Sequence, residues 1–188
     1  CTDYTIGYDT AMNTAVEMID KIRDTAQSHD RCSVVEVMGR RAGHIALNTG
    51  IACGASFIIV PEVGYHIEDV ITKISAAREL GKHHFIIVVA EGIGKVDEIS
   101  KEIETRTGIE TRGTVLGHVQ RGGNPSVRDR VEATRMGYRA VELLEQGIGN
   151  RVIGIKGAEI VDYDIQEALQ MKKSFDMELY HIANEISF

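Results

Sequence analysis

Three short runs of mainly β-branched, apolar residues constrain the fold of this chain more than any other feature. They cover residues 32–38 (CSVVEVM), 57–60 (FIIV) and 84–90 (HFIIVVA), and stretches with helical periodicity separate them. Continuous apolar runs of this length are typical of strands buried on both faces, as in a parallel sheet. The alternation therefore predicts an α/β fold, a three-layer sandwich around a mainly parallel sheet.

The same patterns predict the remaining elements. Further strands are expected near 110–116 and 152–155, and residues 120–126 (QRGGNPS) carry the signal of a loop. Helices are expected over about 5–27, 42–52, 68–80, 96–106, 127–146 and the amphipathic tail 166–187. Gly108 is the expected C-cap of the helix at 96–106, and Ser126 is the expected N-cap of the helix at 127–146. No repeat or linker-like segment interrupts the sequence, which predicts one compact unit.

Charge and cysteine content exclude several classes of protein. The formal net charge is −7 and the pI is about 5.5, which argues against nucleic acid or an anionic membrane as partner. No apolar run approaches the roughly 20 residues of a transmembrane helix. Cys1, Cys32 and Cys53 match neither a disulfide framework nor a metal site, and indicate reduced thiols of a cytoplasmic protein. Any anion site must therefore be built locally.

Polar residues follow three of the predicted strands, at the edge where parallel α/β sheets bind ligands. Arginine can hold a phosphate through two hydrogen bonds, glycines let a backbone approach closely, and a carboxylate accepts hydrogen bonds from sugar hydroxyls. The residues with this chemistry are Met38, Gly39, Arg40, Glu91, His118 and Arg121. Ordinary structural roles stay open for each: a salt-bridged arginine, a helix N-terminal glutamate, or a plain turn before the next helix.

Two further arginines lie at the opposite ends of their strands. Arg31 precedes the strand at 32–38, and Arg112 lies near the start of the strand at 110–116. A seven-residue strand spans roughly 20 Å, so Arg31 and Arg40 of one chain are not expected to contact the same small ligand. If all these arginines serve one site, a neighbouring chain must donate Arg31 and Arg112, which predicts an oligomer with shared sites.

Three segments closely resemble bacterial-type ATP-dependent 6-phosphofructokinases: residues 2–8 (TDYTIGY), 36–40 (EVMGR) and 114–123 (TVLGHVQRGG). Pro61-Glu62 and the position of Arg31 also fit, and the similarity runs in order along nearly the whole chain. The resemblance implies a phosphofructokinase-like fold in which 1–188 is the sugar-phosphate-binding portion, without the N-terminal ATP-binding portion.

The resemblance also implies a reaction and a division of roles. ATP, assisted by Mg²⁺, would transfer its γ-phosphoryl group to the 1-hydroxyl of fructose 6-phosphate. Arg40 would be catalytic and would also contact the sugar phosphate, together with the other strand-end residues and with Arg31 and Arg112 of the next subunit. The family's catalytic Asp and nucleotide motif precede the first residue here. The chain is therefore expected to be inactive alone and not to be the main binder of ATP or Mg²⁺.

An effector site for ADP or phosphoenolpyruvate is implied as well, in a cytoplasmic homo-oligomer. Its matching residues are Arg23, Gly54, Lys82, His83 and His84. Ser56 replaces a frequent acidic residue and Leu80 a common lysine, which predicts weakened or altered allosteric control. Two alternatives stay open: a pyrophosphate-dependent phosphofructokinase and a non-catalytic sugar-phosphate sensor.

Overall fold

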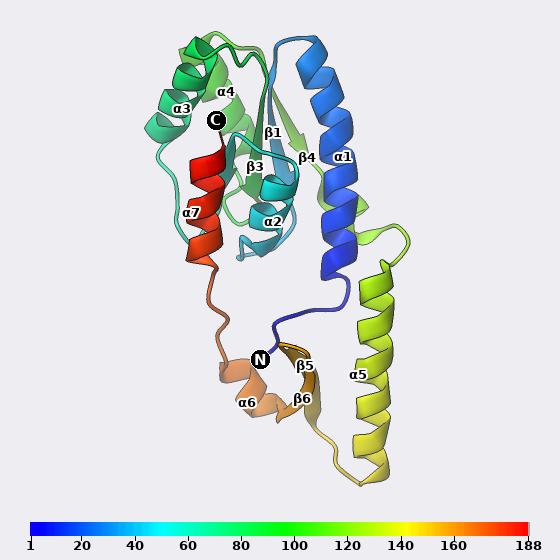
Figure 1. The fold of residues 1–188 in the computed structure, drawn as a ribbon. Coiled ribbons are helices and arrows are strands. Elements are labelled where there is room, and N and C mark those ends of the chain that lie inside the picture. Colours follow the sequence, from blue (N-terminus) through cyan, green and yellow to red (C-terminus); the bar gives the residue numbers. More distant parts are fainter. Residues whose placement is uncertain (188) are drawn as a thin grey trace. The chain divides into compact units, whose positions relative to one another are not determined.

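The computed structural model describes residues 1–187, which form seven α-helices, six strands and one 3₁₀ helix (Figure 1). In chain order they are α1 (Tyr8–Ser28), β1 (Cys32–Val37), α2 (His44–Ala52), β2 (Phe57–Ile59), α3 (Ile67–Glu79), β3 (Phe85–Ala90), α4 (Val96–Thr107), β4 (Thr111–Val115), η1 (Gly117–Arg121), α5 (Val127–Glu145), β5 (Arg151–Lys156), β6 (Glu159–Asp164), α6 (Ile165–Gln170) and α7 (Met177–Ile186).

The chain divides into two compact units. The larger unit contains residues 11–122 and the tail from Phe175, and the smaller contains residues 1–10 and 123–174. The prediction of one compact unit is therefore wrong. One boundary falls inside α1, between Thr10 and Ala11, and another falls between Ser174 and Phe175; neither carries a linker signal. The third falls between Gly122 and Gly123, inside the predicted loop, which by itself does not indicate a division into two units.

The larger unit is built around a four-stranded sheet with the order β2-β3-β1-β4, and each neighbouring pair is parallel. The register pairs Cys32 with Phe85 on one side and with Thr111 on the other, so β1, β3 and β4 start level with one another. All six residues of β3 are buried, as expected for a central strand. The predicted α/β fold with a mainly parallel sheet is confirmed.

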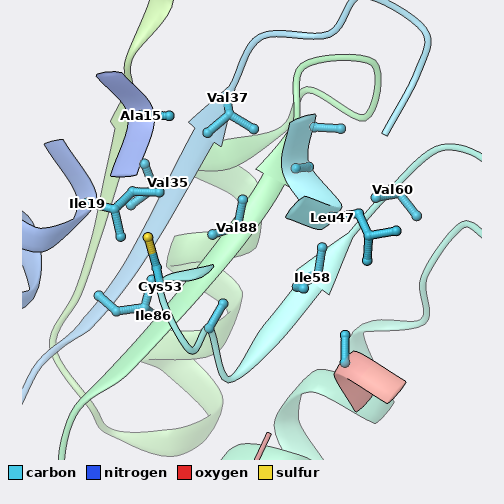
Figure 2. Packing of buried hydrophobic residues seen from close by; sticks show 14 of the residues in the cluster. Ala15, Ile19, Val35, Val37, Leu47, Cys53, Ile58, Val60, Ile86 and Val88 are labelled. Carbon is cyan, nitrogen blue, oxygen red and sulfur yellow. The ribbon is translucent and has the colours of Figure 1, made fainter. Parts of the chain in front are cut away.

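Alternate residues of the central strands face two separate hydrophobic clusters. On β1, Val35 and Val37 join one cluster with residues of α1, α2 and α7, whereas Cys32 and Val34 join the other with residues of α3 and α4. Figure 2 shows the first cluster, in which Ile86 and Val88 of β3 point to the same face as Val35. Because successive side chains of a strand point to opposite faces, the sheet lies between two helical layers.

The smaller unit contains α5, α6 and an antiparallel hairpin of β5 and β6, which pairs Arg151 with Asp164 and Lys156 with Glu159. The N-terminal segment joins this hairpin, since the Asp3 N–H donates to the Ile155 carbonyl at 2.7 Å. The sequence predicts β5 but misses β6, because its residues (EIVDYD) are exposed or half-buried and carry no strong apolar signal.

The buried carboxylate of Asp129, in the first turn of α5, connects that helix to the segment before α1 and to the first turn of α1. It accepts hydrogen bonds from the Gly7 N–H at 2.8 Å and the Thr10 N–H at 2.9 Å. The hydroxyls of Tyr4 and Thr10 also donate to it. Burial raises the pKa of Asp129, but these hydrogen bonds outweigh burial and bring it down to about 2.

Two other local predictions need correction. The tail is not one helix, because residues 171–176 separate α6 from α7, and Asp176 caps α7 by accepting the Leu179 N–H. The predicted loop 120–126 begins as the end of η1, so Gln120 and Arg121 are helical. The predicted caps hold: Gly108 is left-handed after α4, and the Ser126 hydroxyl accepts the Asp129 N–H. Among residues 1–187, no helix has the length and apolarity needed to cross a membrane.

Candidate functional site

The carboxyl ends of β1, β3 and β4 meet at one edge of the sheet. Val37 pairs with Ala90, and Glu36 pairs with both Val89 and Val115. The residues that follow these strands therefore lie next to one another, as the sequence predicts. Burial, and then the nearby charge of Glu91, raises the pKa of Glu36 above its usual range, which places two carboxyl groups at this edge.

Hydrogen bonds join the three strand ends through the loop that follows β1. The Met38 N–H donates to Oε1 of Gln120 at 2.7 Å, and the Arg40 N–H donates to Oε1 of Glu91. Arg40 has a left-handed backbone, with φ of 55°, which is uncommon for a residue with a side chain. The structure thus brings Met38, Gly39, Arg40 and Glu91 together in one set of contacting loops.

Close backbone approach fixes the shape of this edge. A Cβ on Gly92 would lie 2.6 Å from the carbonyl oxygen of Arg40, and a Cβ on Gly43 would lie 2.5 Å from Cβ of Val60. Side chains at these two positions would push the loops apart. The Gly43 N–H in turn donates to both carboxylate oxygens of Glu62, at 2.8 and 3.1 Å.

The 3₁₀ helix η1 carries the two candidate hydrogen-bond donors that follow β4. His118 and Arg121 are exposed, whereas Gln120 between them is buried. Arg40 is exposed as well. The edge therefore offers three side chains suited to anionic oxygens beside the carboxylate of Glu91. Sequence reasoning did not single out Gln120, because a glutamine within a loop-like segment carries no distinctive signal.

Arg31 and Arg112 lie at the opposite, amino-terminal edge, since Cys32 pairs with Thr111 there. Both bind Glu110: Nε of Arg31 donates at 2.8 Å, and Nε and Nη2 of Arg112 donate at 3.0 and 2.6 Å. Arg31 first, and then Arg112, holds the pKa of the Glu110 carboxyl below its usual range. Within one chain these arginines do not join Arg40, in agreement with the strand-length argument.

Three of the predicted effector residues interact electrostatically. Burial, and then the charges of Lys82 and Arg23, lowers the pKa of His84, and burial followed by Arg23 lowers that of Lys82. Nη2 of Arg23 is buried without a hydrogen-bond partner among the described residues. Gly54 has a left-handed backbone that follows α2, and His83 lies one residue after Lys82 along the chain.

Ser56 and Leu80, the two positions at which the predicted effector site departs from the family pattern, differ in their exposure. Ser56 is buried at 6% exposure, whereas Leu80 is 79% exposed directly after α3. No group of three His, Cys, Asp or Glu side chains within residues 1–187 is arranged to hold a metal ion.

A parallel sheet with helices on both faces, and with exposed Arg and His side chains in the segments after its strands, defines an α/β protein of the class whose ligand sites generally lie at the carboxyl edge of the sheet. The chain belongs to the phosphofructokinase family, because the family model described as "Phosphofructokinase" matches residues 1–144.

The curated relatives extend this similarity to nearly every residue. The chain is 55% identical over 186 residues to the ATP-dependent 6-phosphofructokinase of Bacillus cytotoxicus and 56% identical to that of Bacillus mycoides. Each match covers 99% of this chain and 58% of the relative. The chain therefore spans somewhat more than half the length of these relatives.

Solved structures agree with the fold. Phosphofructokinase from Saccharomyces cerevisiae matches with a TM-score of 0.82 and 34% identity, over 98% of this chain and 25% of that chain. The Pichia pastoris enzyme in the T-state matches with a TM-score of 0.90 at 24% identity, over 99% of this chain and 26% of that chain. A pyrophosphate-dependent phosphofructokinase from Marinobacter aquaeolei matches with a TM-score of 0.74 at 21% identity, over 93% and 49%. The last two show the fold alone.

Proposed function

We propose that this chain is the fructose 6-phosphate-binding portion of an ATP-dependent 6-phosphofructokinase. The complete enzyme would transfer the γ-phosphoryl group of ATP to the 1-hydroxyl of the sugar and release fructose 1,6-bisphosphate and ADP. The observation that carries this proposal is the meeting of three strand ends, at which the Arg40 N–H binds Glu91 and the Met38 N–H binds Gln120.

Each side chain at this edge has a role that its chemistry supports. Arg121 and His118, both exposed on η1, suit the 6-phosphate of the sugar. Glu91 uses Oε1 for the loop, and its second oxygen is left to accept a sugar hydroxyl. Arg40 suits the oxygens of the transferring phosphoryl group, whose negative charge a fixed guanidinium stabilises. The remaining contacts would come from the backbone at Met38 and Gly39.

Relatives that share more than half of their aligned residues with this chain are named ATP-dependent, which favours ATP over pyrophosphate as donor. Mg²⁺ would supply charge neutralisation on the phosphates in the complete enzyme. The described residues offer no group of three metal ligands. We propose that the sugar phosphate is the ligand of this chain, and that ATP and Mg²⁺ bind mainly outside it in the complete enzyme.

The proposal is tested by titrating the chain with fructose 6-phosphate in a calorimeter, with glucose 6-phosphate as the competing sugar phosphate. We expect saturable binding that prefers fructose 6-phosphate and that Arg121→Ala abolishes. Lys101→Ala, which removes one exposed cation from α4, is the matched control and should bind as the native chain does. Equal binding of both sugars, or unchanged binding in Arg121→Ala, would contradict the assignment.

We further propose that a neighbouring subunit completes the site with Arg31 and Arg112. Their position at the opposite edge from Arg40 supports this, because one chain cannot bring both edges to a single sugar. Arg31→Ala and Arg121→Ala chains should each bind weakly, and refolding them together should restore binding in the mixed oligomers. Failure of the mixture to exceed the separate variants would show that the sites are not shared.

A second, anionic site is proposed at Arg23, Lys82 and His84, for ADP or phosphoenolpyruvate. The buried Nη2 of Arg23, which has no acceptor among the described residues, supports it, because an unpaired buried cationic N–H is costly. Leu80 in place of a cation should make this site weak. Calorimetric titration with ADP should give weak binding that Arg23→Ala removes, and tight binding would contradict the predicted weakening.

A further inference from the structure

The loop between β1 and α2 is held by three side chains that come from other strand ends. Gln120 accepts the Met38 N–H, Glu91 accepts the Arg40 N–H, and Glu62 accepts the Gly43 N–H. Residues 38–43 thus have acceptors after β2, after β3 and in η1. The backbone on both sides of the Arg40 side chain is fixed by groups outside the loop.

Gln120 differs from the other two acceptors in its burial. It is 1% exposed, whereas Glu91 is half-buried and Glu62 is exposed. Because Met38 presents an N–H donor at 2.7 Å, the amide oxygen of Gln120 must face it. The amide nitrogen is thereby directed elsewhere, and no group among residues 1–187 accepts a hydrogen bond from it.

A buried amide with an unused donor is a poor choice for stability alone. An apolar side chain of similar length would remove the unpaired amide nitrogen, but it would also remove the acceptor of the Met38 N–H. The presence of glutamine therefore points to the one bond that it does make. That bond connects η1, which carries His118 and Arg121, to the loop that carries Arg40.

We infer that Gln120 is a positioning residue: it holds the β1–α2 loop and η1 at the spacing with which Arg40, His118 and Arg121 face one ligand. This inference rests on the proposed function for the identity of that ligand. Gln120 need not contact the sugar phosphate itself. It keeps Arg40 on one loop in register with His118 and Arg121 on η1, so that less ordering remains to be done when the ligand binds.

Three variants test the role of this bond. Gln120→Met keeps the length of the side chain and removes the acceptor. Gln120→Glu keeps an oxygen that can accept the Met38 N–H. Val119→Ala changes the exposed neighbour on η1 and serves as the matched control. Thermal unfolding of each variant separates a loss of fold from a loss of positioning.

The first readout is the amide proton of Arg40, which is monitored through its NMR chemical shift and its hydrogen-exchange rate. Its own acceptor is Glu91, so a purely local change at Met38 would leave it unaltered. We expect Gln120→Met to shift this proton and to accelerate its exchange by more than the loss of global stability accounts for, because the unpaired Met38 N–H also lowers the melting temperature. Gln120→Glu and Val119→Ala should retain the native shift and rate.

The second readout is the affinity for fructose 6-phosphate, which should fall about tenfold in Gln120→Met, or about 1.4 kcal/mol, and stay near native in Gln120→Glu. If the native chain does not bind the sugar phosphate, the proposed function fails, whereas an Arg40 amide changed only in Gln120→Met still supports the positioning role. A native Arg40 amide in Gln120→Met overturns the inference. Equal loss in the Met and Glu variants also overturns it, because packing and not the hydrogen bond would then hold the loop.

Discussion

Replacing Asp129 by asparagine exchanges one carboxylate oxygen for an amide nitrogen at a buried position of the smaller unit. In the native chain Oδ1 accepts hydrogen bonds from the Tyr4 hydroxyl and the Gly7 N–H, and Oδ2 accepts them from the N–H and hydroxyl of Thr10. The asparagine oxygen can keep the first pair. The amide nitrogen, however, is a donor that would face the donating Thr10 N–H.

The expected cost follows from these contacts. A buried donor left without an acceptor costs about 1–3 kcal/mol, and the remaining hydrogen bonds lose the assistance of the charge. Asp129 is 2% exposed, so water does not readily replace the lost acceptor. We expect Asp129→Asn to lower the free energy of unfolding of the smaller unit by about 2–4 kcal/mol at pH 7.

The pKa of Asp129 adds a dependence on pH. Its value is about 2 in the folded chain against 3.8 for the free side chain. Because the folded pKa is the lower one, the carboxylate stabilises the fold fully above the unfolded pKa, and this contribution is lost as pH falls toward 2. The difference between native chain and variant should therefore shrink by roughly 2 kcal/mol between pH 5 and pH 2.

Urea unfolding followed by circular dichroism at several pH values measures both effects. Glu145→Gln, at the exposed end of the same helix, changes the net charge equally and should change the free energy of unfolding by only a few tenths of a kcal/mol. An Asp129→Asn midpoint equal to that of Glu145→Gln at pH 7 would refute the reasoning. So would a difference that stays constant down to pH 2.

Three further changes have expected outcomes. Gly43→Ala should destabilise the larger unit by about 1–3 kcal/mol in urea unfolding, because its Cβ would lie 2.5 Å from the side chain of Val60. Gly137→Ala is the control: its Cβ would have no atom within 4 Å, so it should stabilise α5 by about 0.5–1 kcal/mol. Burial raises the pKa of Cys32 to about 12 and that of Cys53 to about 11, so a thiol reagent at pH 8 should modify both only after unfolding, and rapid reaction in the native chain would contradict their burial. Glu110→Ala should release the two arginines at the amino-terminal edge and allow inorganic phosphate to bind there in calorimetry, whereas an unchanged heat signal would show that they form no anion site alone.

The centre of the main sheet could be predicted because β2 and β3 are uninterrupted apolar runs and β1 is mainly apolar. The run at 84–90 matches β3, all of whose residues are buried, and the alternation with helices fixes a parallel arrangement. The meeting of Arg40 and Glu91 follows from that topology alone, because the carboxyl ends of parallel strands share one edge. The sequence therefore predicts which residues come near one another at this edge.

The burial of Asp129, the contact of Gln120 and the division of the tail could not be predicted, because they depend on tertiary contacts that leave no signal in the local sequence. An acidic residue in the first turn of a helix is expected to be exposed, yet Asp129 is buried by partners about 120 residues away. The contact of Gln120 with Met38 spans 82 residues and leaves no periodic trace. The division of the tail at 171–176 lacks proline and glycine, the usual signals of a break.

The way in which the two units are assembled from the sequence affects how the chain can fold during synthesis. Each unit consists of two segments that are separated in the sequence by a segment of the other unit. Neither unit is therefore complete early in translation. The hydrogen-bond partner of Tyr4 is Asp129, which is synthesised 125 residues later. The carbonyl of Ile58 accepts a hydrogen bond from Tyr180, which follows 122 residues later. At about 5–20 residues per second, a ribosome needs on the order of ten seconds to supply each missing partner. During that interval the face of the sheet that α7 later covers stays open, and a chaperone that binds exposed apolar strands would have its best access then.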